Sequence, residues 1–254
     1  MPTVIIIGAS SGLGREIALT YINRGYRVGV AARRLECLTE MIAMAPDRVK
    51  AGRIDVTDIN AAQILENFIS EFDTPIDLFV NCAGIGFANP QLEPQRDIDT
   101  VATNCLGFTR IIDCMFNYYA ANSLKGQIAS ISSIAGTRGI GIAASYSASK
   151  RFQSEYFTAL TQLARQHKLP ITLTDIKPGF IDTPLLDSGT KYPMIMPPQR
   201  ATKAIVKAID RRRNRVVINR RWAIVVGLWK CIPAGIWRRM RLGLSSKKTN
   251  KLTI

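Results

Sequence analysis

Tyr146 and Lys150, four residues apart, are the pair in this chain best suited to acid–base chemistry. Positions i and i+4 of a helix lie on one face, one turn apart, so the two side chains would meet. A phenol has a pKa near ~10 in water, and a neighbouring ammonium favours the phenolate. Such a pair could exchange a proton with a substrate near neutral pH. The spacing also fits an ordinary helix with an exposed lysine and a packed tyrosine, so its meaning depends on the elements around it.

A glycine-rich turn near the N-terminus predicts a phosphate site. It follows a short β-branched strand at residues 3–7 and precedes helical periodicity at 15–24. Backbone N–H groups and the helix dipole at such a junction attract a diphosphate, and glycines let it approach closely. A plain tight turn is the alternative. The residues of the turn are Gly8, Ala9, Ser10, Ser11, Gly12, Leu13 and Gly14.

Two arginines, Arg33 and Arg34, stand at the carboxyl end of the second predicted strand, residues 27–32. In dinucleotide-binding folds an acidic residue near this point takes the ribose 2′-OH, whereas arginine accommodates a 2′-phosphate. No acidic residue follows the strand until Glu36. The sequence therefore favours NADP(H) over NAD(H). The alternative is two surface arginines that open the next helix.

Strand and helix patterns alternate as far as residue 218, which predicts an α/β fold with a doubly wound parallel sheet and helices on both faces. This is the three-layer Rossmann fold, in which ligands bind beyond the carboxyl ends of the strands. Further strands are expected at 50–54, 77–80, 127–131, 170–176 and 215–218, and helices at 59–72, 92–103, 106–121, 144–166 and 200–212. Several polar or glycine-rich positions fall at strand ends, which favours a catalytic role for the tyrosine–lysine pair.

The motifs, in this order, resemble the compact single-domain branch of the short-chain dehydrogenase/reductase family over roughly residues 3–218. They are the glycine turn, Asn81-Cys82-Ala83-Gly84, Asn104 with Gly107, Ser133, Tyr146-x-x-x-Lys150, and Pro178-Gly179 followed by Thr183. Ile7 and Cys82 depart from the family pattern, which has threonine and a second asparagine there. Neither change removes a catalytic group.

The resemblance implies an NADPH-dependent oxidoreductase that interconverts a carbonyl and a secondary alcohol, with a catalytic tetrad. Tyr146 would protonate the carbonyl oxygen, and Lys150 would bind the nicotinamide ribose and lower the pKa of Tyr146. Ser133 would hydrogen-bond the developing oxyanion. Asn104 would hold the local backbone and a water that relays protons to Lys150. The implied cofactor-binding residues are Gly8, Ser10, Ser11, Gly12, Leu13, Gly14, Arg33, Arg34, Asp55, Val56, Asn81, Ala83, Gly84, Tyr146, Lys150, Pro178, Gly179, Ile181 and Thr183.

The family also commonly forms a homodimer or homotetramer through the helices that carry Asn104 and Tyr146. We expect an apolar or lipid-like substrate, because residues 182–199 form a predicted loop or lid rich in leucine and methionine. The same loop could instead be a surface excursion packed on the body. Two rival functions remain: a non-catalytic NADP(H)-binding sensor or scaffold, and a membrane-docked interaction protein.

The net charge of +15 is concentrated at the C-terminus. Thirteen of the 34 Lys and Arg residues, and none of the 19 Asp and Glu residues, follow Asp210. We therefore divide the chain into a catalytic domain at 1–218 and a basic, tryptophan-containing tail at 219–254. Tryptophans beside arginine clusters are typical of a segment on an anionic membrane surface, here 211–248. The alternatives are packing on the body or on a partner subunit, and nucleic-acid binding, which the apolar content disfavours.

The composition excludes several other classes. Five cysteines without a CxxC pair argue against a disulfide framework or a structural zinc site, and we expect no metal. One histidine, His167, makes a histidine-dependent hydrolase improbable. The N-terminus lacks the basic region and cleavage site of a signal peptide. We expect a cytoplasmic protein, peripheral on the inner face of the membrane if the tail docks there.

Overall fold

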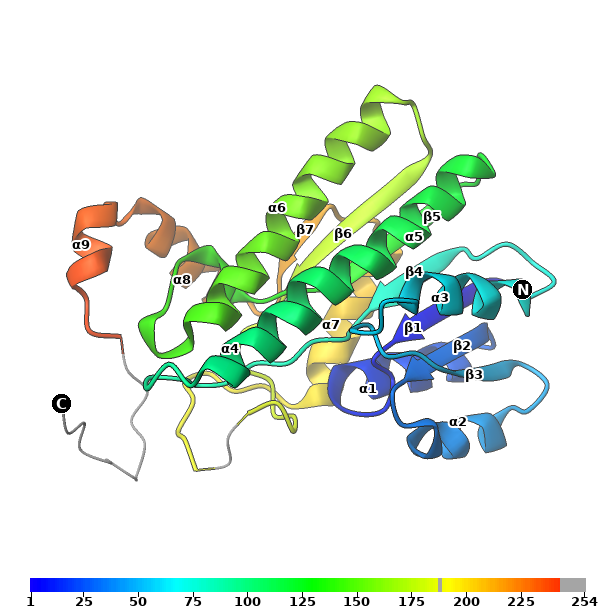
Figure 1. Cartoon of the computed structure of the whole chain (residues 1–254), viewed down its shortest axis with the longest axis horizontal. Coiled ribbons are helices and arrows are strands. Elements are labelled where there is room, and N and C mark those ends of the chain that lie inside the picture. The colour runs from blue at the N-terminus through cyan, green and yellow to red at the C-terminus, as the bar shows by residue number, and fades with distance from the viewer. Residues whose placement is uncertain (187–188, 243–254) are drawn as a thin grey trace.

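The computed structural model describes residues 1–186 and 189–242, and a parallel sheet of seven strands runs through it (Figure 1). The strand order is β3-β2-β1-β4-β5-β6-β7. The predicted α/β fold is confirmed, and the predicted strand bounds are right to within about one residue. The strands are β1 (Thr3–Ile7), β2 (Arg27–Ala32), β3 (Val49–Arg53), β4 (Leu78–Asn81), β5 (Gly126–Ile131), β6 (Ile171–Lys177) and β7 (Arg215–Val217).

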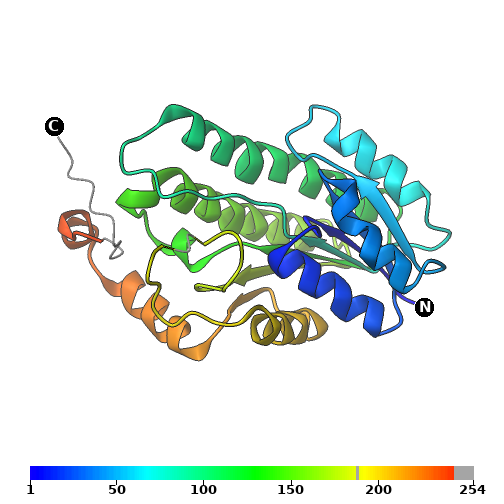
Figure 2. The same ribbon diagram turned by 90° about the horizontal axis from the view of Figure 1, so that it is seen from below.

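Two layers of helices cover the sheet, because alternate side chains of each strand point to opposite faces. Val4 and Ile6 of β1 pack with α1 and α7, whereas Ile5 and Ile7 pack with α3, α5 and α6. Figure 2 shows the sheet between the two layers. The helices are α1 (Gly12–Asn23), α2 (Thr39–Met44), α3 (Ala61–Ser70), α4 (Pro94–Val101), α5 (Phe108–Ala121), α6 (Ala144–Gln166), α7 (Pro198–Asp210), α8 (Arg220–Cys231) and α9 (Ala234–Arg239). Short turns of 3₁₀ helix are η1 (Leu35–Leu38), η3 (Ile134–Thr137) and η4 (Gly141–Ala143).

The sheet reverses its order at β1. From β1 the chain builds outwards to β2 and β3, then returns to the other side of β1 with β4. The connections that leave the carboxyl ends of β1 and β4 therefore go to opposite faces and open a crevice between them. Every loop that carries a predicted site residue ends at this edge.

The helix that carries Asn104 is continuous, which corrects the two separate helices expected at 92–103 and 106–121. α4 passes through a π-helical segment, η2 (Ala102–Gly107), directly into α5. A π-helical segment admits an extra residue without ending the helix, and such segments are frequent at functional sites. Asn104 lies within this segment, fully buried.

The C-terminal segment folds into two short helices that lie at the end of the molecule away from the N-terminus (Figures 1 and 2). Pro233 separates α8 from α9. Trp222 and Val226 of α8 pack with Ile134 in a small third apolar cluster. No helix among the described residues is long and apolar enough to cross a membrane. Lys247 and Lys248, which belong to the predicted membrane-binding stretch, lie outside the described residues.

The predicted lid runs as an irregular segment past the sheet edge, and residues 187–188 of it lie outside the described residues. A parallel bridge joins Ile181 to Met196 and ties the end of the segment to the body. Met196 is buried in the core against α7, and Met194 packs beside the Trp222 cluster. The segment therefore packs on the body and, as described below, also contributes to a cavity wall.

Candidate active site

The glycine turn between β1 and α1 has the backbone geometry that the predicted phosphate site needs. Gly8 has a φ of +82°, and a Cβ there would lie 2.7 Å from the backbone nitrogen of Ala83. A Cβ on Gly14 would lie 2.1 Å from the carbonyl oxygen of Gly8. Side chains at either position would push the turn apart. The turn is thus folded tightly against the start of α1, with the helix N-terminus facing the crevice.

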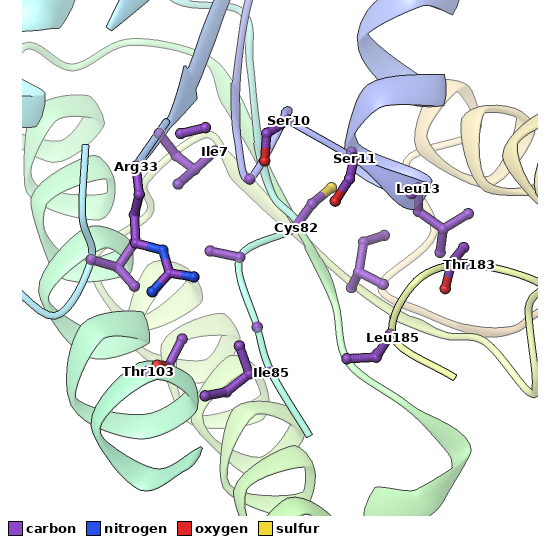
Figure 3. Close-up of a pocket in the computed structure, with 18 of the residues that line it drawn as sticks. Ile7, Ser10, Ser11, Leu13, Arg33, Cys82, Ile85, Thr103, Thr183 and Leu185 are labelled. Carbon is purple, nitrogen blue, oxygen red and sulfur yellow. The ribbon is translucent and has the colours of Figure 1, made fainter. Parts of the chain in front are cut away.

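A cavity of about 320 Å³ lies over this turn at the carboxyl ends of the strands. Figure 3 shows Arg33 on one side, Leu13 and Thr183 on the other, and Cys82 between them. The structure places many predicted cofactor residues together here: the cavity is lined by Gly8, Ser10, Ser11, Gly12, Leu13, Gly14, Arg33, Arg34, Asp55, Val56, Ala83, Gly84, Tyr146, Lys150 and Thr183.

Four predicted cofactor residues do not line this cavity. Asn81 is buried behind it, where its side-chain oxygen accepts a hydrogen bond from the backbone of Ala83 at 3.2 Å. Pro178, Gly179 and Ile181 line a second cavity instead. Asn81 thus shapes the turn after β4 and does not face the cavity.

Arg33 and Arg34 are exposed at the rim of the cavity. Within the described residues neither side chain forms an ion pair. An arginine that has no carboxylate partner keeps its five N–H donors for a ligand, and a planar guanidinium matches a phosphate well. The pair therefore supplies a site for a phosphate group at the end of β2.

Tyr146 lies on α6 where the two cavities meet, because its side chain lines both. Burial raises the pKa of its phenol, and a hydrogen bond with the Ser133 side chain lowers it in part. The Lys150 Nζ lies 5.8 Å from the centroid of the Tyr146 ring. Burial dominates, so the net pKa of Tyr146 is raised, and the lowering of this pKa by Lys150 that the family resemblance implies stays a prediction. Tyr146 therefore keeps its proton at neutral pH, as a general acid must.

Ser133 follows β5 and caps the short helix η3, where its Oγ accepts a hydrogen bond from the backbone N–H of Ala135 at 3.1 Å. This bond uses an acceptor lone pair and leaves the hydroxyl proton free to donate. Ser133 is buried and lines the second cavity beside Tyr146. Two hydroxyl groups, one from β5 and one from α6, therefore face the same space.

Lys150 is buried, and two acceptors fix its ammonium. Its Nζ donates to the carbonyl oxygen of Ile131 at 3.0 Å and to Oε1 of Gln153 at 3.1 Å. Burial lowers the pKa of Lys150 to about 8. The amide of Gln153 in turn donates to the carbonyl oxygen of Asn104 at 2.9 Å. The Gln153 side chain thus links the backbone of Asn104 to Lys150, and the relay water that the family resemblance implies stays a prediction.

Asn104 acts on the backbone after β4. Its Oδ1 accepts from the N–H of Ile85 at 2.9 Å, and its Nδ2 donates to the carbonyl oxygen of Ile85 at 2.7 Å. A second donation from Nδ2 reaches Ser149 Oγ at 3.1 Å. Asn104 therefore ties the wall of the first cavity to the helix of Tyr146. It lines neither cavity itself.

The second cavity, of about 440 Å³, extends from Tyr146 towards α8. Aromatic and aliphatic side chains form most of its wall. Many of them belong to the loop after β6, to η4 and to α8. They include Phe87, Ile140, Ile142, Phe180, Leu185, Leu186, Tyr192, Trp222, Trp229 and Leu242. Neither Met194 nor Met196 is among these residues, so the methionines are not the apolar groups of the cavity.

Trp222 closes this cavity by packing on a glycine. A Cβ on Gly179 would lie 2.3 Å from the indole ring of Trp222. Phe180 and Trp229 contact the same indole with centroid distances of 5.6 and 6.1 Å. Two of the tail tryptophans therefore form a cavity wall, which sequence reasoning assigned to a membrane surface instead.

The chain matches the short chain dehydrogenase family over residues 2–192. It belongs to that family. A relative from Streptomyces coelicolor, named a putative ketoacyl reductase, is 35% identical over 197 residues, covering 74% of each chain. The members of this family are oxidoreductases, and the protein is a short-chain dehydrogenase/reductase enzyme.

Two solved structures resemble this short-chain dehydrogenase closely in fold. A variant of actinorhodin polyketide ketoreductase with NADPH has a TM-score of 0.64 and 30% identity, covering 72% of each chain. A short chain dehydrogenase from Burkholderia cenocepacia in complex with NADP has a TM-score of 0.80 and 22% identity, covering 94% of this chain and 96% of that one. The tight glycine turn and the unpaired arginines of the first cavity fit such a dinucleotide.

Several residues of the site carry no motif and were missed. Ile85 and Thr103 line the first cavity, and Trp229 and Leu242 line the second. Gln153 could have been found, because it follows Lys150 by three residues on the same helix face. The cavity residues from α8 had no such signal, since their position depends on how the C-terminal segment packs.

Proposed function

We propose that this enzyme reduces the carbonyl group of an apolar substrate with NADPH, and that Tyr146 donates the proton. The observation that carries the proposal is the position of Tyr146, whose side chain lines both the crevice over the glycine turn and the apolar cavity. A proton donor for a hydride transfer must stand where cofactor and substrate meet. Among the predicted tetrad residues, Tyr146 meets this condition most directly.

Each residue of the candidate tetrad has its own role in the proposed reaction. When bound, NADPH supplies the hydride. Tyr146 gives its proton to the carbonyl oxygen, and Ser133 donates a hydrogen bond to that oxygen as negative charge develops on it. The buried ammonium of Lys150, held by Ile131 and Gln153, stabilises the phenolate that Tyr146 becomes. Asn104 acts through the backbone of Ile85 and is a positioning residue.

The substrate class is inferred from the second cavity. Its volume of about 440 Å³ lies in the range of ligand pockets for small organic molecules. Trp222, Phe180 and Ile142 offer apolar contact, whereas Ser133 and Tyr146 are among the hydroxyl groups of its lining. The name of the S. coelicolor relative supports a ketone that carries an acyl chain.

The preference for NADPH over NADH is part of the proposal. Arg33 and Arg34 stand at the end of β2 and have no carboxylate partner among the described residues, so they are free to bind a 2′-phosphate. NADP or NADPH is present in the two solved structures compared above. Both observations favour the phosphorylated dinucleotide.

Replacement of Tyr146 by phenylalanine tests the mechanism. NADPH oxidation with a panel of long-chain ketones and aldehydes should fall at least ~100-fold, because general acid catalysis commonly contributes that much. NADPH affinity, followed by fluorescence, should change little. Tyr26→Phe is the control, since Tyr26 lines neither cavity.

Turnover by Tyr146→Phe at the wild-type rate would contradict the mechanism. A wild-type protein that binds NADPH but turns over none of the carbonyls, nor any alcohol with NADP, would instead support the rival function of a nucleotide sensor or scaffold.

We also infer a homodimer. α4, η2 and α6 expose large apolar side chains on neighbouring surfaces. A second copy is the occupant that the family resemblance implies for these helices. Light scattering after size-exclusion chromatography should give twice the chain mass, and a monomer would contradict the inference. The exposed side chains are Ile98, Val101, Leu106, Phe152 and Leu163.

A further inference from the structure

α8 has two apolar faces, and only one of them is used by the fold. Trp222, Val226 and Trp229 recur at spacings of four and three residues and turn towards the body. Trp222 and Val226 are buried. The inner face of α8 is therefore fixed by packing and forms part of the apolar cavity wall.

Arg138 and Trp237 hold the end of this helix in place. The Arg138 guanidinium donates to the carbonyl oxygens of Lys230 at 3.0 Å and Ile232 at 2.6 Å, where the helix ends. Trp237 of α9 donates from Nε1 to the carbonyl oxygen of Gly139 at 2.8 Å. The orientation of α8 and α9 on the body is thus well determined, and so is the direction of their outer face.

Both helices expose large aliphatic side chains, two on the outer side of α8 and one on α9. Ile224, Leu228 and Ile236 are 66%, 63% and 56% exposed. Ile224 and Leu228 are one turn apart on the same side of α8. Gly227 lies between them, and a Cβ there would meet nothing within 4 Å. No described residue covers this surface, which is open towards solvent.

Basic side chains surround the aliphatic ones. All of them are exposed, and none forms an ion pair with a described residue. No acidic residue follows Asp210, so the C-terminal helices themselves carry basic charge only. The cations are Arg220, Arg221, Lys230, Arg238 and Arg239.

We propose that this outer face of α8 and α9 docks on an anionic lipid bilayer, with Ile224, Leu228 and Ile236 inserted between headgroups. Aliphatic side chains ringed by arginine match the layered chemistry of that surface, which is apolar inside and negative at the headgroups. Each basic residue near such a surface raises the binding constant about fivefold. α8 and α9 are too short to span the bilayer, so they would lie in its plane.

A second copy of the chain fits this face less well. Two-fold contact would bring the same arginines together in pairs without a carboxylate between them. Nucleic acid would leave the three aliphatic side chains without a partner. The bilayer is the occupant that satisfies both the charge and the apolar groups.

Docking does not depend on the proposed reductase activity, but it bears on the substrate. The inner face of α8 lines the apolar cavity, and Leu242, which follows α9, lines it too. A docked protein would therefore hold that cavity beside the lipid surface. If the proposed function holds, the carbonyl substrate is one that partitions into the bilayer.

The test is co-sedimentation of the full chain with vesicles of phosphatidylcholine, with or without phosphatidylglycerol. The variant carries Ile224→Ser and Leu228→Ser. The matched control carries Met44→Ser and Ile59→Ser, which remove exposed apolar side chains on either side of β3, at the sheet edge opposite β7 and α8. A charge variant carries Arg238→Gln and Arg239→Gln. NADPH binding and thermal melting of every variant verify the fold independently of docking.

We expect the wild type and the control to sediment with the anionic vesicles, and less so as salt increases. The serine variant should bind at least ~10-fold more weakly, and the charge variant should lose its preference for phosphatidylglycerol. A wild type that stays in the supernatant overturns the proposal. So does a serine variant that binds like the wild type. A wild-type oligomer that the serine variant splits also overturns it, because the face then belongs to a second copy.

Discussion

Replacing Arg33 with alanine should weaken the binding of NADPH much more than that of NADH. Arg33 lines the dinucleotide cavity at the end of β2 and has no ion-pair partner among the described residues. Its guanidinium is therefore available to a 2′-phosphate, and its removal disturbs no interaction of the fold.

The expected loss of NADPH affinity depends on how exposed the Arg33 side chain is. A hydrogen bond to a charged group is worth about 1.5–3 kcal/mol. Because Arg33 is exposed at the rim, solvent screening places the value near the lower end of this range. Since ~1.4 kcal/mol is a factor of ten, we expect the KM for NADPH to rise about 10- to 30-fold. The KM for NADH should change less than about threefold.

The assay is the steady-state oxidation of each reduced cofactor, followed by absorbance, with a fluorescence titration of binding in parallel. Arg53→Ala is the matched control. Arg53 ends the neighbouring strand β3, is also exposed, and does not line the cavity. Equal loss for the two cofactors would refute the role of Arg33. An equal effect of Arg53→Ala would show that only the general positive potential of this edge matters.

Two further predictions concern the buried groups around Lys150. If the ammonium must be charged to stabilise the Tyr146 phenolate, kcat/KM for reduction should be level below the Lys150 pKa of about 8 and fall as pH rises through it. Lys150→Arg should move that fall to higher pH, and a fall at the same pH would contradict the assignment. Gln153→Leu removes the bonds to Lys150 Nζ and the Asn104 carbonyl, which leaves buried polar atoms unpaired. Urea unfolding should show that the free energy of unfolding falls by about 2–4 kcal/mol. For the exposed control Gln63→Leu it should fall by less than about 0.5 kcal/mol. Equal losses in the two variants would reject a bridging role for Gln153.

The sheet could be predicted from sequence because its signals are local. β-branched runs such as residues 3–7 must be buried on both faces, and glycines mark the turns that follow them. The continuous helix around Asn104 could not be predicted in the same way. Its sequence suggests a break, but the hydrogen bonds of Asn104 to Ile85 come from a segment far along the chain. The residues of the π-helical segment have no glycine–proline signal or periodicity that marks it in the sequence, and the bonds of Asn104 are made to another loop.

The candidate tetrad could be named because its members, Asn104, Ser133, Tyr146 and Lys150, occur in motifs that follow one another in the order of the family. Their electrostatics could not be predicted. The direction of the Tyr146 pKa depends on burial by residues such as Gly86, over which the ring packs. The acceptors of Lys150 depend equally on tertiary packing. Trp222 shows the same limit, because tryptophan beside arginine is equally compatible with a lipid surface and with a cavity wall.

The wall that Trp222, Trp229 and Leu242 contribute to the apolar cavity has a consequence for how such enzymes diverge. The match to the family ends at residue 192, before these three residues. Part of the wall of the proposed substrate cavity is thus encoded beyond the family match, whereas Phe87, Ile142 and Phe180 of the same wall lie within it. A new C-terminal helix pair could change which molecules enter while Ser133, Tyr146 and the dinucleotide crevice remain unaltered. Exchange of this segment between relatives should therefore alter one part of the apolar cavity while the dinucleotide crevice stays as it is.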